Sequence, residues 1–548
     1  MLSISNGRIL LAIVLGASLA VWGQGGNGRA GRAAAQQAPT PGSAPAGATG
    51  RGGAATEFFN FDSTAVAGPA IPASPPAETH RKITINGEAL AYTARAGYLP
   101  LRNATTGQSE AHLFYTCYIK DGVTGAPMRP VLFFLGGAPG VAAIWQEFGG
   151  LGPKRMKWAN DGTAGLPPYS WEDNPHTLLG QADLVFVNPV GTAFSRADQP
   201  GRAPSFWNTA ADIASLGEFV RSFINTNDRR NSPLFLAGED FGTGRVAGLA
   251  AYLNDHQIPV HGVVLLSMTM TADSLAGDAQ YITLLPSLIM AAWHHKKLAP
   301  ELSAMSAEQI SGQARQFASR EYLHALYKGD RMSPDERTKV IAGLSRLTGL
   351  SKAFVVNNNL RITLDRFNAE LMRDQHRGLA NSDARVSGFM PPPIGGGRGG
   401  GGFAGVVSAP IDYNLYNRAG GFQAAYEAYL RSELAFNGNS NGFFYLSNGG
   451  IGPFTSTGND DASLAAAFAR SPNLRLFVAV NYFDLHAPFY ASEYTLAHLN
   501  VSPEVRAHNI TVSHFEAGQM TYADSKALGK LHTDLARFVN EAIAPAHK

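Results

Sequence analysis

The sequence predicts an α/β protein in which a mostly parallel sheet forms the core and one mainly helical domain is inserted into that core. Two observations carry this prediction. Short apolar runs of strand length alternate with amphipathic helical segments through residues 77–271, and the alternation returns in residues 451–548. Between these parts, residues 272–450 are mainly helical in pattern. We therefore expect a core in two parts, 77–271 and 451–548, with a helical cap, 272–450, inserted between them.

The first residues have the features of an export signal. Arg8 precedes an apolar run over 9–22, which is short for a transmembrane helix and matches the charged and apolar parts of a signal peptide. We predict a signal peptide over 1–22, with an uncleaved membrane anchor as the alternative. Residues 23–76 are rich in Gly, Ala and Pro. They predict a disordered linker, because this composition buries too little apolar surface to fold.

The amino-acid composition restricts the cellular location and the binding partners that we expect for the protein. Apolar residues make up 45% of the 548 residues, and the net charge is +2 with no long basic run, which argues against nucleic acid as a partner. Cys117 is the only cysteine, so no intramolecular disulfide can form. An export signal with a single thiol fits a bacterial envelope protein. We expect a secreted or periplasmic location with no stable membrane span after signal cleavage; the sequence does not indicate an oligomeric state.

The first part of the core is predicted to open with a β-hairpin, because Asn86-Gly87 is a typical two-residue hairpin turn between strand-like segments. Further strands are predicted at 111–122, 130–135, 183–188, 233–237 and 263–266. Helices are predicted at 211–227 and 244–253.

The insertion contains one clear helix start. Ser333 to Glu336 form a capping box with proline at the first helical position. A glycine tract over 395–406 predicts a mobile loop. The second part of the core has predicted strands at 474–480 and 509–515 and ends in an amphipathic helix, whose apolar face carries Leu531, Leu535, Phe538 and Val539.

Several segments carry a family resemblance. Residues 234–245, LFLAGEDFGTGR, have the spacing of the Gly-x-Ser-x-Gly turn that presents the nucleophile of α/β-hydrolases, with Asp240 in place of the serine. Five more segments keep their order and spacing: RPVLFFLGGAPG, YSWEDN, DLVFVNPVGTAFSR, LFVAVNYFDLHAPF and HFEAGQM. From about residue 79 onward, the chain resembles the bacterial branch of the serine carboxypeptidases. The resemblance implies an α/β-hydrolase core with a helical cap.

The resemblance places the catalytic triad on residues of which only one keeps its type. The nucleophile position falls on Asp240, the acid position on Asp484 and the histidine position on Gln519. The asparagine of the family's Asn-Gly-Gly-Pro-Gly segment falls on Gly136, and the acidic residue usual before Pro-Val-Gly-Thr falls on Asn188. The resemblance therefore implies a degraded triad.

The resemblance also implies the groups that bind substrate. Main-chain N–H groups of Ala138 and Phe241, beside Gly137, would form the oxyanion site. Glu239 corresponds to the glutamate that helps to bind a peptide's C-terminal carboxylate through a shared proton. The second acid that partners it in some members falls on Gly150. A purely structural role for Glu239, in support of the turn, is the alternative.

These substitutions are incompatible with serine-type acyl transfer at these positions. Asp240 has no hydroxyl to activate, and the amide of Gln519 does not accept a proton near neutral pH. An aspartate on this turn can also act as a carboxylate nucleophile, as in haloalkane dehalogenases and epoxide hydrolases, but that mechanism needs a histidine. His486 and His514 are the candidates close in sequence to the acid and histidine positions.

No metal or cofactor is expected, because Asp240, Glu239, Asp484 and His486 show no ligand-like clustering in the sequence. We predict an exported serine carboxypeptidase-like protein that is catalytically impaired and binds a peptide C-terminus or a small molecule in an inherited cleft. The alternatives are a hydrolase with Asp240 as carboxylate nucleophile and an active serine-type hydrolase that uses other residues.

Overall fold

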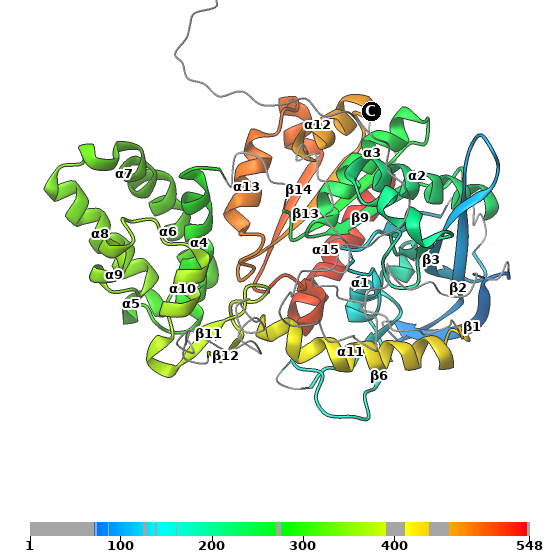
Figure 1. Ribbon diagram of the computed structural model, residues 1–548, viewed down its shortest axis with the longest axis horizontal. Coiled ribbons are helices and arrows are strands. Elements are labelled where there is room, and N and C mark those ends of the chain that lie inside the picture. Colours follow the sequence, from blue (N-terminus) through cyan, green and yellow to red (C-terminus); the bar gives the residue numbers. More distant parts are fainter. Residues whose placement is uncertain are drawn as a thin grey trace, which may run out of the picture. The chain divides into compact units, whose positions relative to one another are not determined.

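The computed structural model describes residues 71, 74–85, 87–123, 129–137, 140–159, 162–269, 276–390, 412–437 and 460–544. Within this part a ten-stranded sheet forms the centre of the fold, with the order β1-β2-β3-β7-β4-β9-β10-β13-β14 and with β8 paired to β3 (Figure 1). Its strands are β1 (Ala77–Ile85), β2 (Glu88–Arg102), β3 (Ser109–Lys120), β4 (Val131–Phe134), β7 (Asp183–Val187), β8 (Arg196–Ala197), β9 (Leu234–Glu239), β10 (Gly262–Leu266), β13 (Arg475–Asn481) and β14 (Ile510–Phe515).

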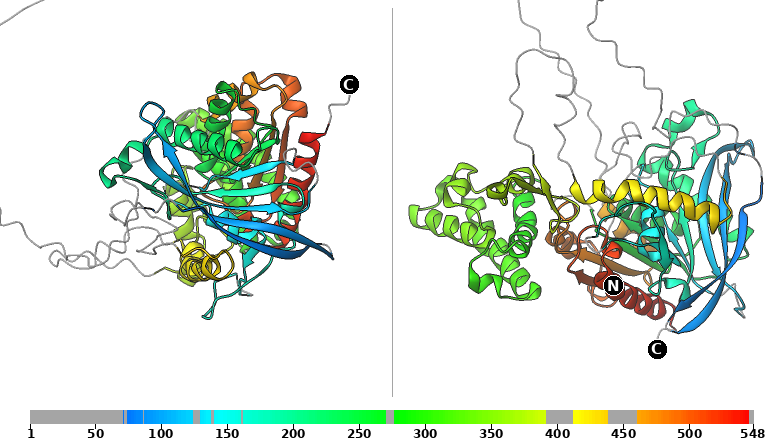
Figure 2. Two further views of the ribbon diagram at one scale, coloured as in Figure 1. Left: turned by 90° about the vertical axis from the view of Figure 1, so that its right-hand side faces the viewer. Right: turned by 90° about the horizontal axis from the view of Figure 1, so that it is seen from below.

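The sheet is antiparallel at one end and parallel through the rest. β1, β2, β3 and β7 pair antiparallel, and every pair from β7 to β14 is parallel. The long antiparallel strands are drawn in blue and cyan in Figure 2. Ile85 pairs with Glu88, which confirms the predicted hairpin, and Gly87 adopts the positive φ of +84° that such a turn requires. The predicted α/β core with a mostly parallel sheet is confirmed.

Helices cover both faces of the sheet, and strand residues alternate between the two layers. Phe133 of β4 packs into the layer formed with α2 (Thr209–Thr226), α3 (Gly242–Asp255) and α12 (Asp460–Arg470). Phe134 packs into the opposite layer, which contains α1 (Ile144–Gln146), α11 (Tyr413–Ser432) and α15 (Ser525–Ile543). Because helices cover both faces of the sheet, the parallel strands carry continuous apolar runs. The apolar face predicted for the C-terminal helix is buried in α15.

A mainly helical region follows β10. It contains α4 (Ala279–His294), α5 (Pro300–Ser303), α6 (Ala307–Phe317), α7 (Leu323–Lys328), α8 (Pro334–Thr348), α9 (Lys352–Asn357) and α10 (Leu364–Glu370), and then the pair β11 (Arg377–Leu379) and β12 (Ser387–Phe389). The predicted capping box is confirmed at the start of α8, where Ser333 and Glu336 exchange side-chain and backbone hydrogen bonds.

Four further elements lie outside the central sheet and the helices named above. They are β5 (Lys154–Met156), β6 (Trp171–Asp173), α13 (Phe489–His498) and α14 (Pro503–His508). Arg315 of α6 forms an ion pair with Glu493 of α13 at 2.6 Å, and α4 also packs against α13. The helical region is thereby joined to the second part of the core.

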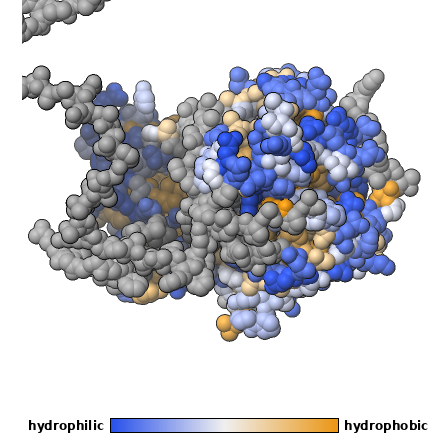
Figure 3. Space-filling view, turned by 45° about the vertical axis from the view of Figure 1, so that its right-hand side comes forward, coloured by the Kyte–Doolittle hydropathy of each residue, from blue (hydrophilic) through white to orange (hydrophobic). Residues whose placement is uncertain are grey.

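The surface drawn in Figure 3 is mainly hydrophilic, and the described helices are not of the membrane-spanning type. On the face drawn in Figure 3, hydrophilic residues predominate and hydrophobic residues form small, scattered groups. Among the described residues, no helix is both long enough and apolar enough to cross a membrane. The predicted signal peptide (1–22), most of the predicted linker (23–76) and the glycine tract (395–406) lie outside the described residues.

Candidate functional site

The turn that carries Asp240 is built as a sharp strand-to-helix elbow. Asp240 lies between β9 and α3 with a φ of +51°, a conformation that few residues with a Cβ adopt. Its N–H donates to the carbonyl of Leu266 at 3.0 Å, and its own carbonyl accepts the N–H of Thr243 at 2.9 Å. These bonds fix the elbow from the neighbouring strand and from the first turn of the helix.

Two glycines make this elbow sterically possible. A Cβ at Gly238 would lie 2.1 Å from the carbonyl oxygen of Gly242, and a Cβ at Gly242 would lie 2.2 Å from the carbonyl oxygen of Gly136. Both distances are far shorter than any real contact. The Gly-x-Asp-x-Gly pattern is therefore a packing requirement of the elbow.

The carboxyl group of Asp240 is occupied by its own surroundings. It accepts the backbone N–H of Phe241 and a side-chain hydrogen bond from Thr269. Burial raises the pKa of Asp240, and the charge of His486 and these hydrogen bonds act in the opposite direction. The N–H that would serve as an oxyanion donor thus already has a hydrogen-bond acceptor.

Asp484 follows β13 and is fully buried. Its Oδ1 accepts the N–H groups of His486 at 2.9 Å and Ala487 at 3.0 Å, whereas its Oδ2 has no partner at hydrogen-bond distance. Burial raises the pKa of Asp484 to about 7; the charge of His486 lowers it and that of Asp240 raises it. One oxygen of this carboxyl is therefore fixed by the loop, and a side-chain hydrogen bond from Ser267 also lowers the pKa.

Gln519 lies in the loop between β14 and α15, and its main chain is held from two sides. Its N–H donates to the carbonyl of Ser382 at 2.7 Å, and its carbonyl accepts the hydroxyl of Ser267 at 2.9 Å. Ser267 also accepts from Asn481, the last residue of β13, at 2.8 Å. These bonds place Gln519 beside the carboxyl ends of β10 and β13.

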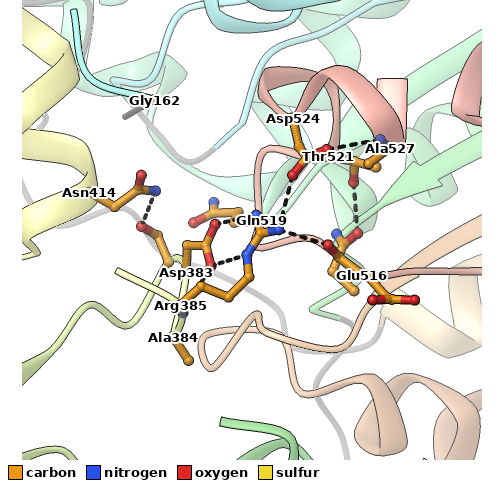
Figure 4. Close-up of polar contacts among 12 residues, drawn as sticks. Gly162, Asp383, Ala384, Arg385, Asn414, Glu516, Gln519, Thr521, Asp524 and Ala527 are labelled. Carbon is orange, nitrogen blue, oxygen red and sulfur yellow. Dashed lines mark hydrogen bonds and ion pairs between the residues drawn. The ribbon is translucent and has the colours of Figure 1, made fainter. Parts of the chain in front are cut away.

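A segment between β11 and β12 supports this loop. Arg385 donates to Asp383 at 2.7 and 2.9 Å, to the carbonyl of Glu516 at 2.8 Å and to Asp524 at 2.9 Å (Figure 4). The N–H of Ala384 donates to the carbonyl of Phe483 at 2.8 Å. We call residues 382–385 the brace, because they bond both the loop of Asp484 and the loop of Gln519.

The loop after β4, where the oxyanion site is expected, is anchored by buried polar groups. Gly136 has a φ of +72°. Arg245 of α3 donates to the carbonyls of Leu135 at 3.0 Å and Gly137 at 2.7 Å, while pairing with Asp212 at 2.6 Å. Ala138, the other expected oxyanion donor, lies outside the described residues.

Asn188 supports the same loop from the end of β7. Its Oδ1 accepts the N–H of Ala143 at 2.8 Å, next to the start of α1. The residue that replaces the family's acid thus still holds the backbone beside the expected oxyanion site.

Glu239, the last residue of β9, is only 5% exposed and accepts the phenol hydroxyl of Tyr522 at 2.8 Å. Burial raises the pKa of Glu239 to about 8; the Tyr522 hydrogen bond lowers it, and the charges of Asp240 and Asp484 raise it. A Cβ at Gly150 would lie 2.6 Å from the carbonyl oxygen of Tyr522. The second acid of some family members therefore has no room here.

The two candidate histidines have different surroundings. His486 is exposed, and its charge acts on both Asp240 and Asp484. His514 instead bonds Glu493 of α13 at 2.6 Å, and Glu493 also pairs with Arg315. Within the described ranges, no group of three or more His, Cys, Asp or Glu side chains is arranged to hold a metal ion.

Comparison with known proteins gives one family match, to part of the chain. A serine carboxypeptidase family model matches residues 85–339. This part of the chain is similar to the serine carboxypeptidases. No curated protein sequence matches the chain.

Two solved structures are similar to the chain to different degrees. The prohormone-processing carboxypeptidase Kex1 of Saccharomyces cerevisiae superposes with a TM-score of 0.51 at 13% identity, covering 82% of this chain and 91% of Kex1. A proline iminopeptidase of Mycobacterium smegmatis has a TM-score of 0.31 at 11% identity, covering 85% of this chain and 98% of its own. The Kex1 similarity establishes the α/β-hydrolase fold.

The structure brings together Glu239, Asp240, Asp484 and the main chain of Gln519, whereas His514 bonds elsewhere. Sequence reasoning missed the contributions of Tyr522, Gln146, Thr269 and the brace. Each lies far in sequence from the residue that it contacts, and none has a local motif that could have revealed it.

Proposed function

We propose that this serine carboxypeptidase family member is an exported protein that has lost serine-type catalysis and binds a peptide end or a small molecule in its inherited cleft. The observation that carries the proposal is the environment of Asp240. The elbow position holds a carboxyl that accepts the N–H of Phe241, so an acceptor occupies a donor that an acyl-transfer intermediate would need. The side-chain amide of Gln519 does not act as a base near neutral pH.

Two measurements on the purified protein test the loss of catalysis. A fluorophosphonate probe should leave every serine unlabelled in a mass spectrum, and blocked dipeptides and activated esters should not be turned over above blank. An active serine carboxypeptidase, treated in parallel, shows that probe and substrates are competent. Stoichiometric labelling of one serine would refute the proposal and favour a serine-type hydrolase that uses other residues.

Export is a separate part of the proposal, and it is supported by the sequence of residues 1–22. When the full chain is expressed in a bacterium, the mature protein should be recovered from the envelope or the medium. Its N-terminus, read by mass spectrometry, should begin after the apolar run. Recovery of the intact N-terminus in the membrane fraction would instead identify an uncleaved anchor.

A hydrolase with Asp240 as carboxylate nucleophile is the second candidate, because the charge of His486 acts on both Asp240 and Asp484. In such an enzyme, a water molecule attacks the ester formed on Asp240. The oxygen of that water molecule then becomes part of the regenerated Asp240 carboxyl group. Turnover of haloalkanes or epoxides in ¹⁸O-labelled water should then leave label in the peptide that contains Asp240. Absence of label and of turnover would remove this candidate.

A further inference from the structure

The starts of two parallel strands, at the sheet edge opposite the candidate site, border a hollow of about 300 Å³. Val131 is the first residue of β4 and Asp183 is the first residue of β7, and both line this hollow. Phe223 of α2 lines it from the other side. Because Glu239 and Asp484 lie at or beyond the carboxyl ends of their strands, the hollow belongs to a different part of the surface.

The lining of this hollow favours an apolar occupant. Its two arginines are already paired, Arg95 with Glu78 at 2.7 Å and Arg229 with Asp183 at 2.6 Å. Asp228, the remaining charged residue of the lining, is exposed. The apolar part of the lining consists of Ile119, Val131, Val185 and Phe223. Paired charges gain little from a further ion, whereas apolar side chains at an open hollow gain from being covered.

The chain approaches its first strand over the same face of the sheet. A Cβ at Gly97 would lie 2.7 Å from the Cα of Pro76, so Pro76 lies against β2 on the side to which a side chain at 97 would point. Residues two apart in a strand share a face, so Arg95 and Leu99 point to that side as well. Arg95 lines the first hollow, and Leu99 lines a second one of about 410 Å³. We call these two hollows, which lie between β2 and α2, the β2–α2 groove.

A short aromatic segment precedes this point in the sequence. Residues 57–62, EFFNFD, contain three phenylalanines, the only aromatic residues of 23–76, and lie outside the described residues. The 14 residues 63–76 separate them from β1. A chain of that length spans about 20 Å as a coil and about 40 Å when extended. The covalent connection therefore keeps the segment at an effective concentration of about a millimolar beside the groove.

We propose that residues 57–62 bind in the β2–α2 groove, with one phenylalanine ring in the hollow lined by Ile119 and Phe223. An apolar cavity of about 150 Å³ holds a benzene ring, so the hollow has room for this side chain. Phe223 is an aromatic partner for the ring, and binding removes the ring from water. The predicted linker is thereby attached at the sheet edge opposite the candidate site, whether or not residues 1–22 are cleaved.

Chymotrypsin tests the proposal on the full chain, because it cleaves after phenylalanine. Cleavage within 57–62, read by mass spectrometry from products that begin at residue 59, 60 or 62, should be slow in the parent. Ile119→Lys places a charge in the hollow and should accelerate this cleavage about fivefold or more. Val512→Lys, in a 37% exposed residue of the edge strand β14, is the matched control and should be cleaved at the parent rate.

Cys117 is a second reporter, because its neighbours on both adjacent strands, Arg95 and Val185, line the hollow. It is the only cysteine, so a small thiol reagent reports on this position alone. The aromatic rings of the segment are removed in the triple variant Phe58→Ser, Phe59→Ser and Phe61→Ser. Its thiol should react about fivefold or more faster than that of the parent. The peptide EFFNFD, acetylated and amidated and added at millimolar concentration, should slow the reaction again.

Thermal melts verify that each variant is folded; if Ile119→Lys is not, the triple variant and the peptide still decide the inference. Equal cleavage within 57–62 in the parent and in folded Ile119→Lys would overturn it, as would unchanged Cys117 reactivity in the triple variant. Protection that grows with protein concentration would also overturn it, because a second copy of the chain would then cover the groove. Neither readout depends on catalysis or on the ligand of the candidate site, so this inference and the proposed function fail separately.

Discussion

Asp240 combines a strained backbone with a substituted side chain. Its φ of +51° lies in the left-handed region, which aspartate tolerates better than most residues with a Cβ. The sharp turn that the family resemblance implies is therefore present, with an aspartate at its centre. The carboxyl of Asp484 is the group that would orient a histidine at position 519. Its Oδ2 has no partner at hydrogen-bond distance among the described residues.

Restoring the two lost groups together should restore chemistry. We expect Asp240→Ser combined with Gln519→His to turn over an activated ester measurably faster than the parent. Each single variant should stay near the parent rate, because a serine needs its base and a histidine needs a hydroxyl to activate. Recovery should be partial, since Gly136 and Asn188 still differ from the family pattern.

Steady-state ester hydrolysis is measured for the parent, both single variants and the double variant. Fluorophosphonate labelling of the serine introduced at position 240 is the second readout. A folded double variant that is no faster than the parent would show that the catalytic positions are wrongly assigned or that the oxyanion site is not preserved.

At the level of elements, the joint between β9 and α3 depends on glycine. Gly238→Ala places a Cβ 2.1 Å from the carbonyl oxygen of Gly242, a backbone atom that cannot move without disturbing the elbow. We expect a loss of about 3 kcal/mol or more in the free energy of unfolding. Chemical denaturation with a structural probe on the intact protein measures it.

Gly312→Ala is the matched control for that change. Gly312 lies within α6, and a Cβ there would meet no atom within 4 Å. Alanine favours helices, so this variant should be neutral or more stable by up to about 1 kcal/mol. Equal effects of the two substitutions would contradict the steric account of the elbow.

Local sequence signals predicted the elements that depend on local chemistry. The Asn86-Gly87 turn predicted the β1–β2 hairpin, the Ser333 capping box predicted the start of α8, and the Gly-x-Asp-x-Gly spacing predicted the elbow. These features follow from backbone angles and short-range hydrogen bonds, which neighbouring residues determine.

Contacts made by distant side chains could not be predicted in this way. The brace reaches the Gln519 loop across more than a hundred residues, as in the bond from Arg385 to the carbonyl of Glu516. Tyr522 meets Glu239 only because α15 packs on the sheet opposite α3. The sequence assigned positions to the candidate site, but the polar partners of those positions depend on tertiary packing.

For the whole molecule, the buried acids predict a fall in stability on the alkaline side of neutrality. Burial raises the pKa of Glu239 to about 8 and the pKa values of Asp484 and of Glu147, the residue after α1, to about 7. In an unfolded chain the same carboxyl groups have pKa values of about 4. Between these values the native state holds more protons than the unfolded state. The free energy of unfolding therefore falls as pH rises.

The clearest window lies between about pH 6.5 and about pH 8, above the range in which histidines with lowered pKa values, such as His294, act in the opposite sense. We expect a loss of about 1–3 kcal/mol across this window, measured as a falling Tm. Glu239→Gln should flatten the fall, and Asp240→Asn should be more stable than the parent near neutral pH. A Tm that rises across the window, or a lower Tm for Asp240→Asn, would contradict this account.

The brace has a consequence for how such a protein can arise. Gln519 is held through its main chain, by the carbonyl of Ser382 and the hydroxyl of Ser267, so these bonds do not depend on which side chain stands at position 519. An ancestor with histidine there could lose it by a single substitution and keep the same loop. Loss of catalysis and loss of stability are thereby uncoupled, and a lineage can abandon the reaction without passing through a poorly folded intermediate.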